Sequence, residues 1–203
     1  RLSFWPKIGA DLGAVTLSER GSDQRFAAIQ HAKVALAVLP LLKKQIVVDT
    51  IYLDGAQVHV IKQADGRFNF DDLLSQDESP SEQINFDVQG IQVSNAAIQF
   101  DDEKSGARYQ VERLNLSTSA VALKKPFEVS TQFHLTANQP AINADISVQA
   151  KLMADPEAKH FSVQGLNAQL KGDVLDGQAV TLTAQGGIDV DAEKSALDVA
   201  GLK

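Results

Sequence analysis

The sequence predicts a mainly β protein: an elongated, twisted antiparallel sheet of repeated hairpins, curled into an apolar groove, with two or three short helices. Two observations favour this fold. Apolar and polar residues alternate over long stretches of the second half of the chain, as in strands with one dry and one wet face. A phrase of apolar positions also recurs, as FDVQGIQV at 86–93 and FSVQGLNA at 161–168, and what it repeats is a shape rather than a reactive group.

The amino-terminal part shows a second self-similarity, with a spacing of forty residues. The apolar positions of 48–60 return in 88–100, with Asp54-Gly55 in the first copy replaced by Ser94-Asn95 in the second. Such residue pairs are typical of tight turns between strands. The pattern therefore predicts two hairpins of the same design.

Helical signals are confined to two short segments before residue 80. One helix is expected over Leu39–Lys44, started by Pro40, and one over Phe70–Leu74, with either Asn69 or Asp71 as its cap. The acidic, serine- and proline-containing stretch 76–83 reads as a linker. We therefore divide the chain into an amino-terminal cap unit (1–75), this linker, and a repeating β-strand groove segment (84–203) that is truncated.

The recurring phrase contains a slip of the strand period. Apolar residues fall three apart and then two apart, as in Val88-x-x-Ile91 and Val163-x-x-Leu166. A strand that keeps one face inward across such a slip needs an extra residue, a β-bulge, which bends it. Gly90 and Gly165 are suited to that geometry, so the phrase predicts bends where the sheet curls.

The later strands supply the candidate binding surface. Period-two alternation runs through 127–137 and 142–152 and returns from 180 onward. The apolar residues of these strands are expected to line one groove. They are Phe127, Val129, Phe133, Leu135, Ile142, Ala144, Ile146, Val148, Val180 and Leu182.

Composition excludes several classes of function. The net charge of −7 argues against a nucleic-acid partner, which requires a basic face. There is no cysteine, and the four histidines have no spacing that forms a local metal site. No serine stands in a nucleophile motif, and no stretch is long and apolar enough to span a bilayer. We expect no enzyme activity, no metal and no cofactor.

Three stretches of the first 74 residues resemble the amino-terminal part of the AsmA family, envelope proteins of Gram-negative bacteria related in style to the TamB proteins. They are FWPKIGADLGAVTL at 4–17, FAAIQHAKVALAVLPLL at 26–42, and LDGA at 53–56 followed by DGRFNFDDLL at 65–74. The resemblance covers about a third of the chain; beyond residue 80 only the general pattern of repeating strands is shared.

The resemblance implies a periplasmic body attached to the inner membrane by an anchor just upstream of Arg1. It also implies kinship with bridge-like lipid-transfer proteins. The expected function is that of a lipid-binding module in a bridge that moves phospholipid toward the outer membrane and supports its biogenesis. Phospholipid acyl chains are the expected ligand.

Other interpretations stay open on the sequence. The apolar face is compatible with a closed sandwich or small barrel as well as with an open groove. Open sheet edges suit a structural adaptor that pairs with an envelope protein during outer-membrane protein assembly. An unrecognised enzyme is the third class.

Overall fold

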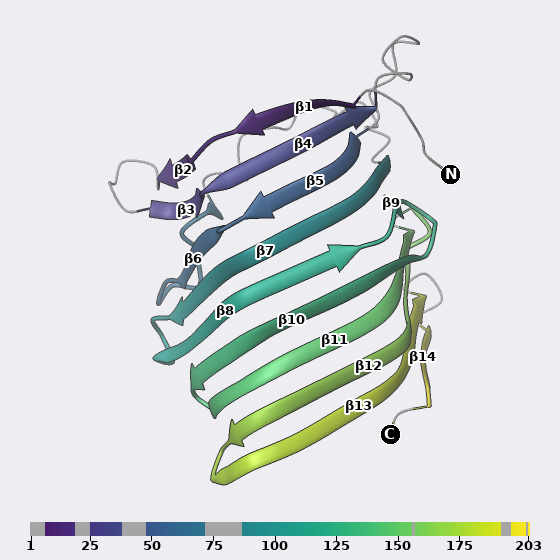
Figure 1. The fold of residues 1–203 in the computed structure, drawn as a ribbon. Helices are drawn as coiled ribbons and strands as arrows, with labels where there is room; N and C mark the ends of the chain where they lie inside the picture. The colour runs from purple at the N-terminus through teal and green to yellow at the C-terminus, as the bar shows by residue number, and fades with distance from the viewer. Residues whose placement is uncertain are drawn as a thin grey trace.

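The computed structural model describes residues 7–18, 25–37, 48–71, 87–155, 157–191, 196–201 and 203. In these residues the chain forms one 14-stranded sheet (Figure 1). Its strands are β1 (Lys7–Leu12), β2 (Val15–Ser18), β3 (Arg25–Ile29), β4 (His31–Ala37), β5 (Val48–Asp54), β6 (Gln57–Lys62), β7 (Asp87–Asp102), β8 (Ala107–Thr118), β9 (Val121–Ala122), β10 (Phe127–Asn138), β11 (Ala141–Asp155), β12 (His160–Val174), β13 (Gly177–Asp191) and β14 (Ala196–Ala200). The main hydrogen-bonded order is β1-β4-β5-β7-β8-β10-β11-β12-β13-β14.

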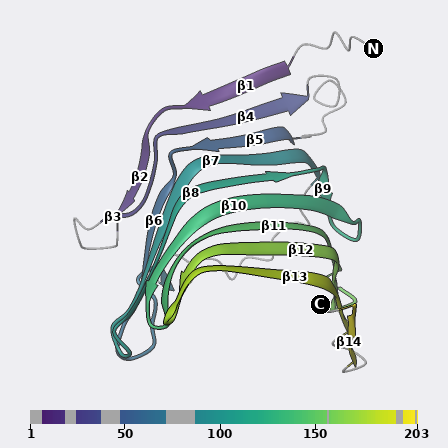
Figure 2. The ribbon, with the colours of Figure 1, turned by 60° about the horizontal axis from the view of Figure 1, so that its bottom comes forward.

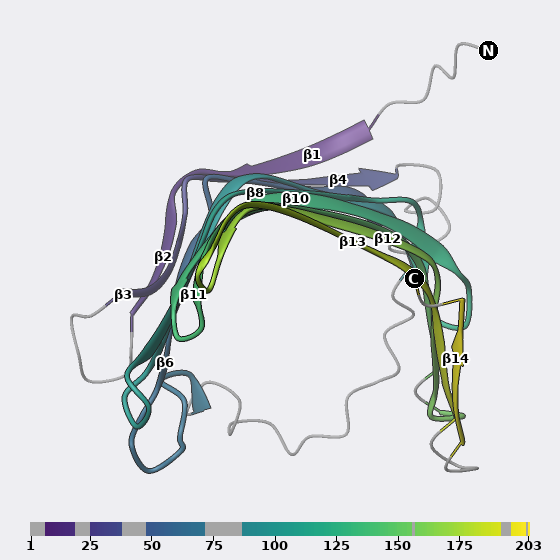
Figure 3. The same ribbon diagram turned by 90° about the horizontal axis from the view of Figure 1, so that it is seen from below.

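The sheet is an open arch. Figures 2 and 3 show that β10–β13 each run up one wall, across the top and toward the other wall. Nearly all neighbouring strands are antiparallel, and no second layer covers either face within the described ranges. The prediction of a twisted, curled, mainly antiparallel sheet is confirmed. The alternative of a sandwich or closed barrel is wrong, since the two ends of the sheet do not meet.

The forty-residue self-similarity marks a parallel strand pair, so the prediction of two matching hairpins is wrong. β5 and β6 both run parallel to β7, and each residue partners the one forty positions later, as Val58 does with Ile98. Gly55 and Asn95 have φ values of 62° and 51°, but they bend the chain rather than reverse it. The Gly55 N–H donates to the Ser94 carbonyl oxygen at 3.0 Å. Strands that bend at the same level stay in register, which explains the repeat.

Two slips of the apolar pattern are β-bulges. The register of β12 with β13 shifts between Val163 and Leu166, where Gly165 has a φ of 59°. A similar shift separates β8 from β10 near Arg113, whose φ is 53°. The prediction is confirmed at these places. At Gly90 the prediction of a bulge is wrong, because that residue has neither a register shift with β5 nor a positive φ. β5 has the same spacing of apolar residues as β7, so the two strands change phase at the same level and stay in register.

The bulge at Gly165 gives a testable expectation for stability. A Cβ at this position meets no atom within 4 Å, so the cost of a side chain comes from the left-handed backbone alone. We expect Gly165→Val to lower the free energy of unfolding by about 1–2 kcal/mol in urea denaturation. Gly165→Asn is the matched variant, since asparagine tolerates this conformation, and its loss should be smaller. Equal losses for the two variants would contradict the bulge.

The predicted helices fall mostly outside the described residues. That is true of all of 39–44 and of 72–74, and equally of the linker 76–83. In the second segment, Asn69 and Phe70 form a turn and Asp71 is helical. The described part of the chain therefore contains essentially no helix, fewer than the two or three predicted. Strands from both proposed units belong to one sheet, because β5 and β6 pair with β7.

Candidate functional site

The two faces of the arch differ in exposure although no other element of the described residues covers them. Ala144 is only 1% exposed and Ala137 8%, whereas Ser130 and Ser147, of similar size, are exposed. In a single bent layer, side chains crowd together on the inner face and spread apart on the outer one. Alanine and its apolar neighbours therefore lie on the concave face, and the serines lie on the convex face.

Apolar residues form unbroken rows across the concave face. One row crosses eight strands from β4 to β13, and none of its members is exposed. Cross-strand pairing links its members in the order Ala32, Leu53, Val93, Leu116, Thr131, Val148, Ala168 and Ala184. Because neighbouring strands lie about 4.8 Å apart, such a row provides continuous apolar contact along the groove.

The few hydroxyl groups on this face are engaged with the backbone. Thr131 Oγ1 donates to the Asn115 carbonyl oxygen at 3.0 Å, and Thr118 Oγ1 accepts the Ile91 N–H at 3.0 Å. The Tyr109 hydroxyl donates to the Gln139 carbonyl oxygen at 2.8 Å. From β7 to β13 the described concave positions between the strand ends carry no charge. The surface offered to a ligand is therefore almost entirely hydrocarbon.

The structure places all ten predicted groove residues on this face. Phe133, Ile146 and Leu182 belong to one cross-strand row, and Leu135, Ala144 and Val180 belong to the next. Phe127, Val129, Ile142 and Val148 occupy the same face of β10 and β11. Nine of the ten are buried or half-buried, while Leu182 is 51% exposed. Leu182 lies on β13 outside the segment that pairs with β14. Contact of these residues with lipid stays a prediction.

The convex face carries polar side chains joined across strands. Three of the histidines contact aspartates on neighbouring strands: His59 with Asp101 at 2.6 Å, His134 with Asp145 at 2.9 Å, and His160 with Asp189 at 2.8 Å. Burial by itself raises the pKa of Asp101, but hydrogen bonds from His59 and Gln99 outweigh it and hold this pKa below its ordinary value. The hydrogen bond from His134 similarly lowers the pKa of Asp145.

These lowered pKa values predict a loss of stability in acid. A carboxyl group whose pKa is lower in the folded chain contributes stability above its unfolded pKa of about 3.9 and loses it as the pH falls through the folded value. We therefore expect the free energy of unfolding to decline below about pH 4. The decline should be shallower in Asp101→Asn, as measured by urea denaturation at several pH values. An unchanged slope in that variant would contradict the assignment.

The segment after β6 closes an edge of the sheet. Asn69 is 8% exposed, and its Oδ1 accepts the Ile61 N–H at 3.0 Å while its Nδ2 donates to the His59 carbonyl oxygen at 2.9 Å. The Phe68 N–H donates to Asp71 Oδ2 at 2.8 Å. Asn69 thus takes the place of a neighbouring strand along part of β6. The DGRFNFDD stretch, as far as it is described, has an architectural role.

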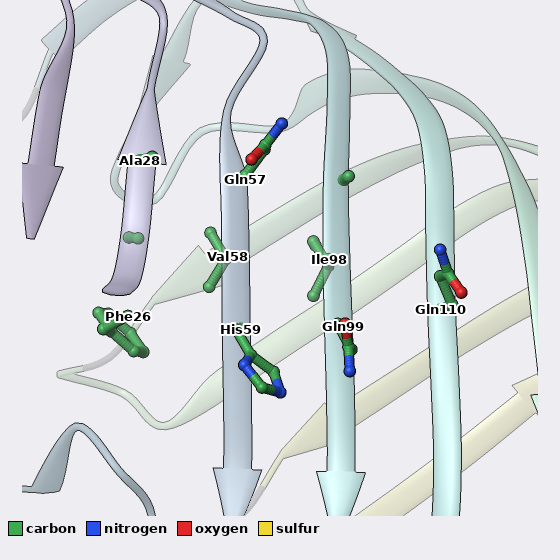
Figure 4. A pocket seen from close by; sticks show the side chains of 10 residues that line it. Phe26, Ala28, Gln57, Val58, His59, Ile98, Gln99 and Gln110 are labelled. Carbon is green, nitrogen blue, oxygen red and sulfur yellow. The ribbon is translucent and has the colours of Figure 1, made fainter. Parts of the chain in front are cut away.

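A hollow on the convex face was not predicted. It has a volume of about 210 Å³ and lies over β3, β6, β7 and β8, as Figure 4 shows. Its lining residues are Phe26, Ala27, Ala28, Gln57, Val58, His59, Ala97, Ile98, Gln99 and Gln110. The available signal was a break in the alternation, since Ala28 and Ala97 pair with Gln57 in a row of the polar face.

Two other kinds of site were sought in the described ranges. No group of three or more histidine, cysteine, aspartate or glutamate side chains there is placed to hold a metal ion. No helix in the same ranges is long and apolar enough to cross a membrane.

Comparison with known proteins gives the family. Protein AsmA of Escherichia coli (strain K12) is 20% identical to this chain over 190 residues, which cover 89% of the chain and 30% of that relative. The chain thus spans less than a third of the relative's length. The AsmA family matches residues 1–201, so the likeness extends well beyond the first 74 residues that carried it in the sequence. The chain belongs to the AsmA family.

Proposed function

We propose that the concave face binds the acyl chains of phospholipids, and that the full-length protein passes these lipids through the bacterial envelope toward the outer membrane. In this proposal the chain is part of a periplasmic body anchored to the inner membrane upstream of Arg1, and it supports outer-membrane biogenesis. The proposal contains no chemical step and assigns no catalytic residue or cofactor.

The uncharged concave surface is the observation that supports the proposal best. Its rows cross the sheet from strand to strand, and Thr118, Thr131 and Tyr109 direct their hydroxyl groups to the backbone. A site for a small polar molecule requires unpaired polar groups that converge on it. Among the described residues between the ends of β7 to β13, this surface offers none. Long hydrocarbon chains are the ligand that it suits.

The energetics favour an extended groove over an isolated site. Burying one CH₂ group contributes about 0.8 kcal/mol, so exposing a sixteen-carbon chain to water costs about 12 kcal/mol. A lipid therefore moves between membranes readily only if apolar contact continues along its path. An arch that is open on one side supplies that contact while the polar headgroup stays in water.

Native mass spectrometry with lipid extraction tests the proposal. The purified protein is expected to carry phospholipid that is released on extraction, in amounts that fall when concave residues are made polar. Absence of lipid after purification from membranes in mild detergent, together with no uptake from phosphatidylethanolamine vesicles, would overturn it.

A structural adaptor is the second candidate, and the edge of β13 favours it. β14 pairs with β13 over Gly187–Asp191, and Lys203 pairs with Gln185. Among the described residues no strand pairs with the outer edge of 178–184, and this stretch carries no charge. Uncharged edges recruit further strands. A protein partner lost in Thr181→Pro, with lipid binding retained, would support the adaptor.

A further inference from the structure

The hollow on the convex face has the composition of a ligand site separate from the groove. Its floor is a row in which Gln57 lies between Ala28 and Ala97 on neighbouring strands. Ala28 and Ala97 are shorter than the glutamines beside them, and they leave a space of about 210 Å³ above the strands. Val58 lies on the opposite, concave side of β6, since side chains alternate along a strand. A ligand in the hollow would therefore not compete with acyl chains.

The lining combines one aromatic wall with amide groups. Phe26 supplies the wall, and its ring is held by Phe70 at a centroid distance of 5.7 Å. Gln57, Gln99 and Gln110 supply the amides (Figure 4). Each amide can donate and accept hydrogen bonds. The hollow therefore suits a ligand with one apolar face and several hydroxyl or amide groups.

Charge in the hollow is already compensated. His59 contacts Asp101 through Nε2, which orients the ring and leaves its Nδ1 edge for another partner. Gln99 also donates to Asp101 at 2.8 Å, and Arg108 Nε lies 3.7 Å from the second carboxylate oxygen. Asp101 lies behind this lining, and its carboxylate would repel an anion; its Oδ1 makes no hydrogen bond within the described part of the chain but lies near Arg108, which would oppose a cation. An uncharged ligand fits best.

Neutral polar residues continue from the hollow across the convex face. Gln99 pairs with Gln110, which is followed on the next strands by Thr136 and Asn143. All four are exposed. Strand addition is the common way in which a sheet binds an extended peptide, but it uses a sheet edge, whereas these residues lie on a face. A row of neutral hydrogen-bonding groups with an aromatic wall at one end suits a chain of sugar rings.

We propose that the hollow binds one ring of an uncharged oligosaccharide, whose next rings lie along Gln110, Thr136 and Asn143. The carbon-bound hydrogens of a pyranose face the Phe26 ring, and its hydroxyl groups bond to the glutamine amides and His59. The site lies beyond the proposed lipid function, because it uses the other face of the sheet.

Titration calorimetry with two probes tests the site: a linear tetramer of glucose and a linear tetramer of N-acetylglucosamine. The wild-type chain should bind at least one of them with a Kd of about 1 mM or below. Ala97→Gln fills the hollow with a side chain common on this face and should weaken binding about tenfold. Gln57→Ala should weaken it similarly, and because the Gln57 side chain is exposed while its backbone pairing with β3 and β7 is kept, this variant is expected to fold. Gln185→Ala, on the same face of β13, should bind as wild type.

The Ala97→Gln and Gln57→Ala variants of the hollow are both expected to retain phospholipid, so the sugar site and the lipid function are tested separately. The absence of heat from both tetramers at about 10 mM would overturn the sugar site. Wild-type affinity in a folded Ala97→Gln or Gln57→Ala variant would overturn it as well.

Discussion

Ile146→Asp is expected to leave the sheet folded while abolishing retention of phospholipid. Ile146 lies in the row of Phe133, Leu170 and Leu182 on the concave face. In an empty groove the new carboxylate can hydrate, because the arch is open on one side (Figure 3). With an acyl chain in place, the carboxylate would be buried against CH₂ groups at a cost of several kcal/mol. Lipid extraction and thermal denaturation on the same sample measure both effects.

Ser147→Asp is the matched control for this change. Ser147 is the next residue of β11, and its side chain is exposed on the convex face. This variant should keep both its melting temperature and its lipid. An Ile146→Asp variant that stays folded and retains as much phospholipid as Ser147→Asp would reject the concave face as the lipid surface. The same outcomes are expected for Val148→Asp with this control.

Gly172→Ala is expected to cause the largest loss of stability of any single methyl addition at a described glycine. Gly172 pairs with Ala144, and a Cβ at position 172 would lie 2.2 Å from the Asn143 carbonyl oxygen and 2.5 Å from Ala144 Cα. These are backbone atoms of the adjacent strand, so no side-chain rotation relieves the contact. Its φ of 151° adds strain for any side chain. We expect a loss of about 2–4 kcal/mol in urea denaturation.

Gly13→Ala provides the comparison for Gly172→Ala. A Cβ at Gly13 meets no atom within 4 Å, and its φ is not positive. Its free energy of unfolding should change by less than about 0.5 kcal/mol. A Gly172→Ala variant as stable as Gly13→Ala would show that β11 and β12 do not approach each other as closely as described.

The long strands of the second half could be predicted because a strict alternation of apolar and polar residues is explained only by strands with one apolar face. Strict alternation over 127–152 fits β10 and β11 and assigns Phe133 and Ile146 to the same face. The parallel pairing of β5 and β6 with β7 could not be predicted in the same way. Gly55 and Asn95 suit positive φ, and positive φ occurs both in hairpin turns and in bends within a strand. Only the strand partners distinguish the two.

The candidate site, too, could be predicted only in part, because the pattern of residues along a strand does not show how the strands are arranged in space. Which residues form the apolar face follows from a period of two, but whether that face closes on itself depends on curvature set by bulges such as Gly165. Alternation is identical in a sandwich and in an open arch. The convex hollow depends on small side chains, Ala28 and Ala97, that strands distant in the sequence bring into one row. That row is visible only once the order of β3, β6 and β7 is known.

Photocrosslinking from two adjacent positions of β11 tests the central claim most directly. A photoreactive residue replaces Ile146 in one sample and Ser147 in another, and each protein is irradiated after loading with phosphatidylethanolamine. The side chains of the two residues point to opposite faces of the same strand. We expect a lipid adduct from position 146 and none from position 147. Adducts of equal yield from both positions, or an adduct from position 147 alone, would contradict lipid binding on the concave face.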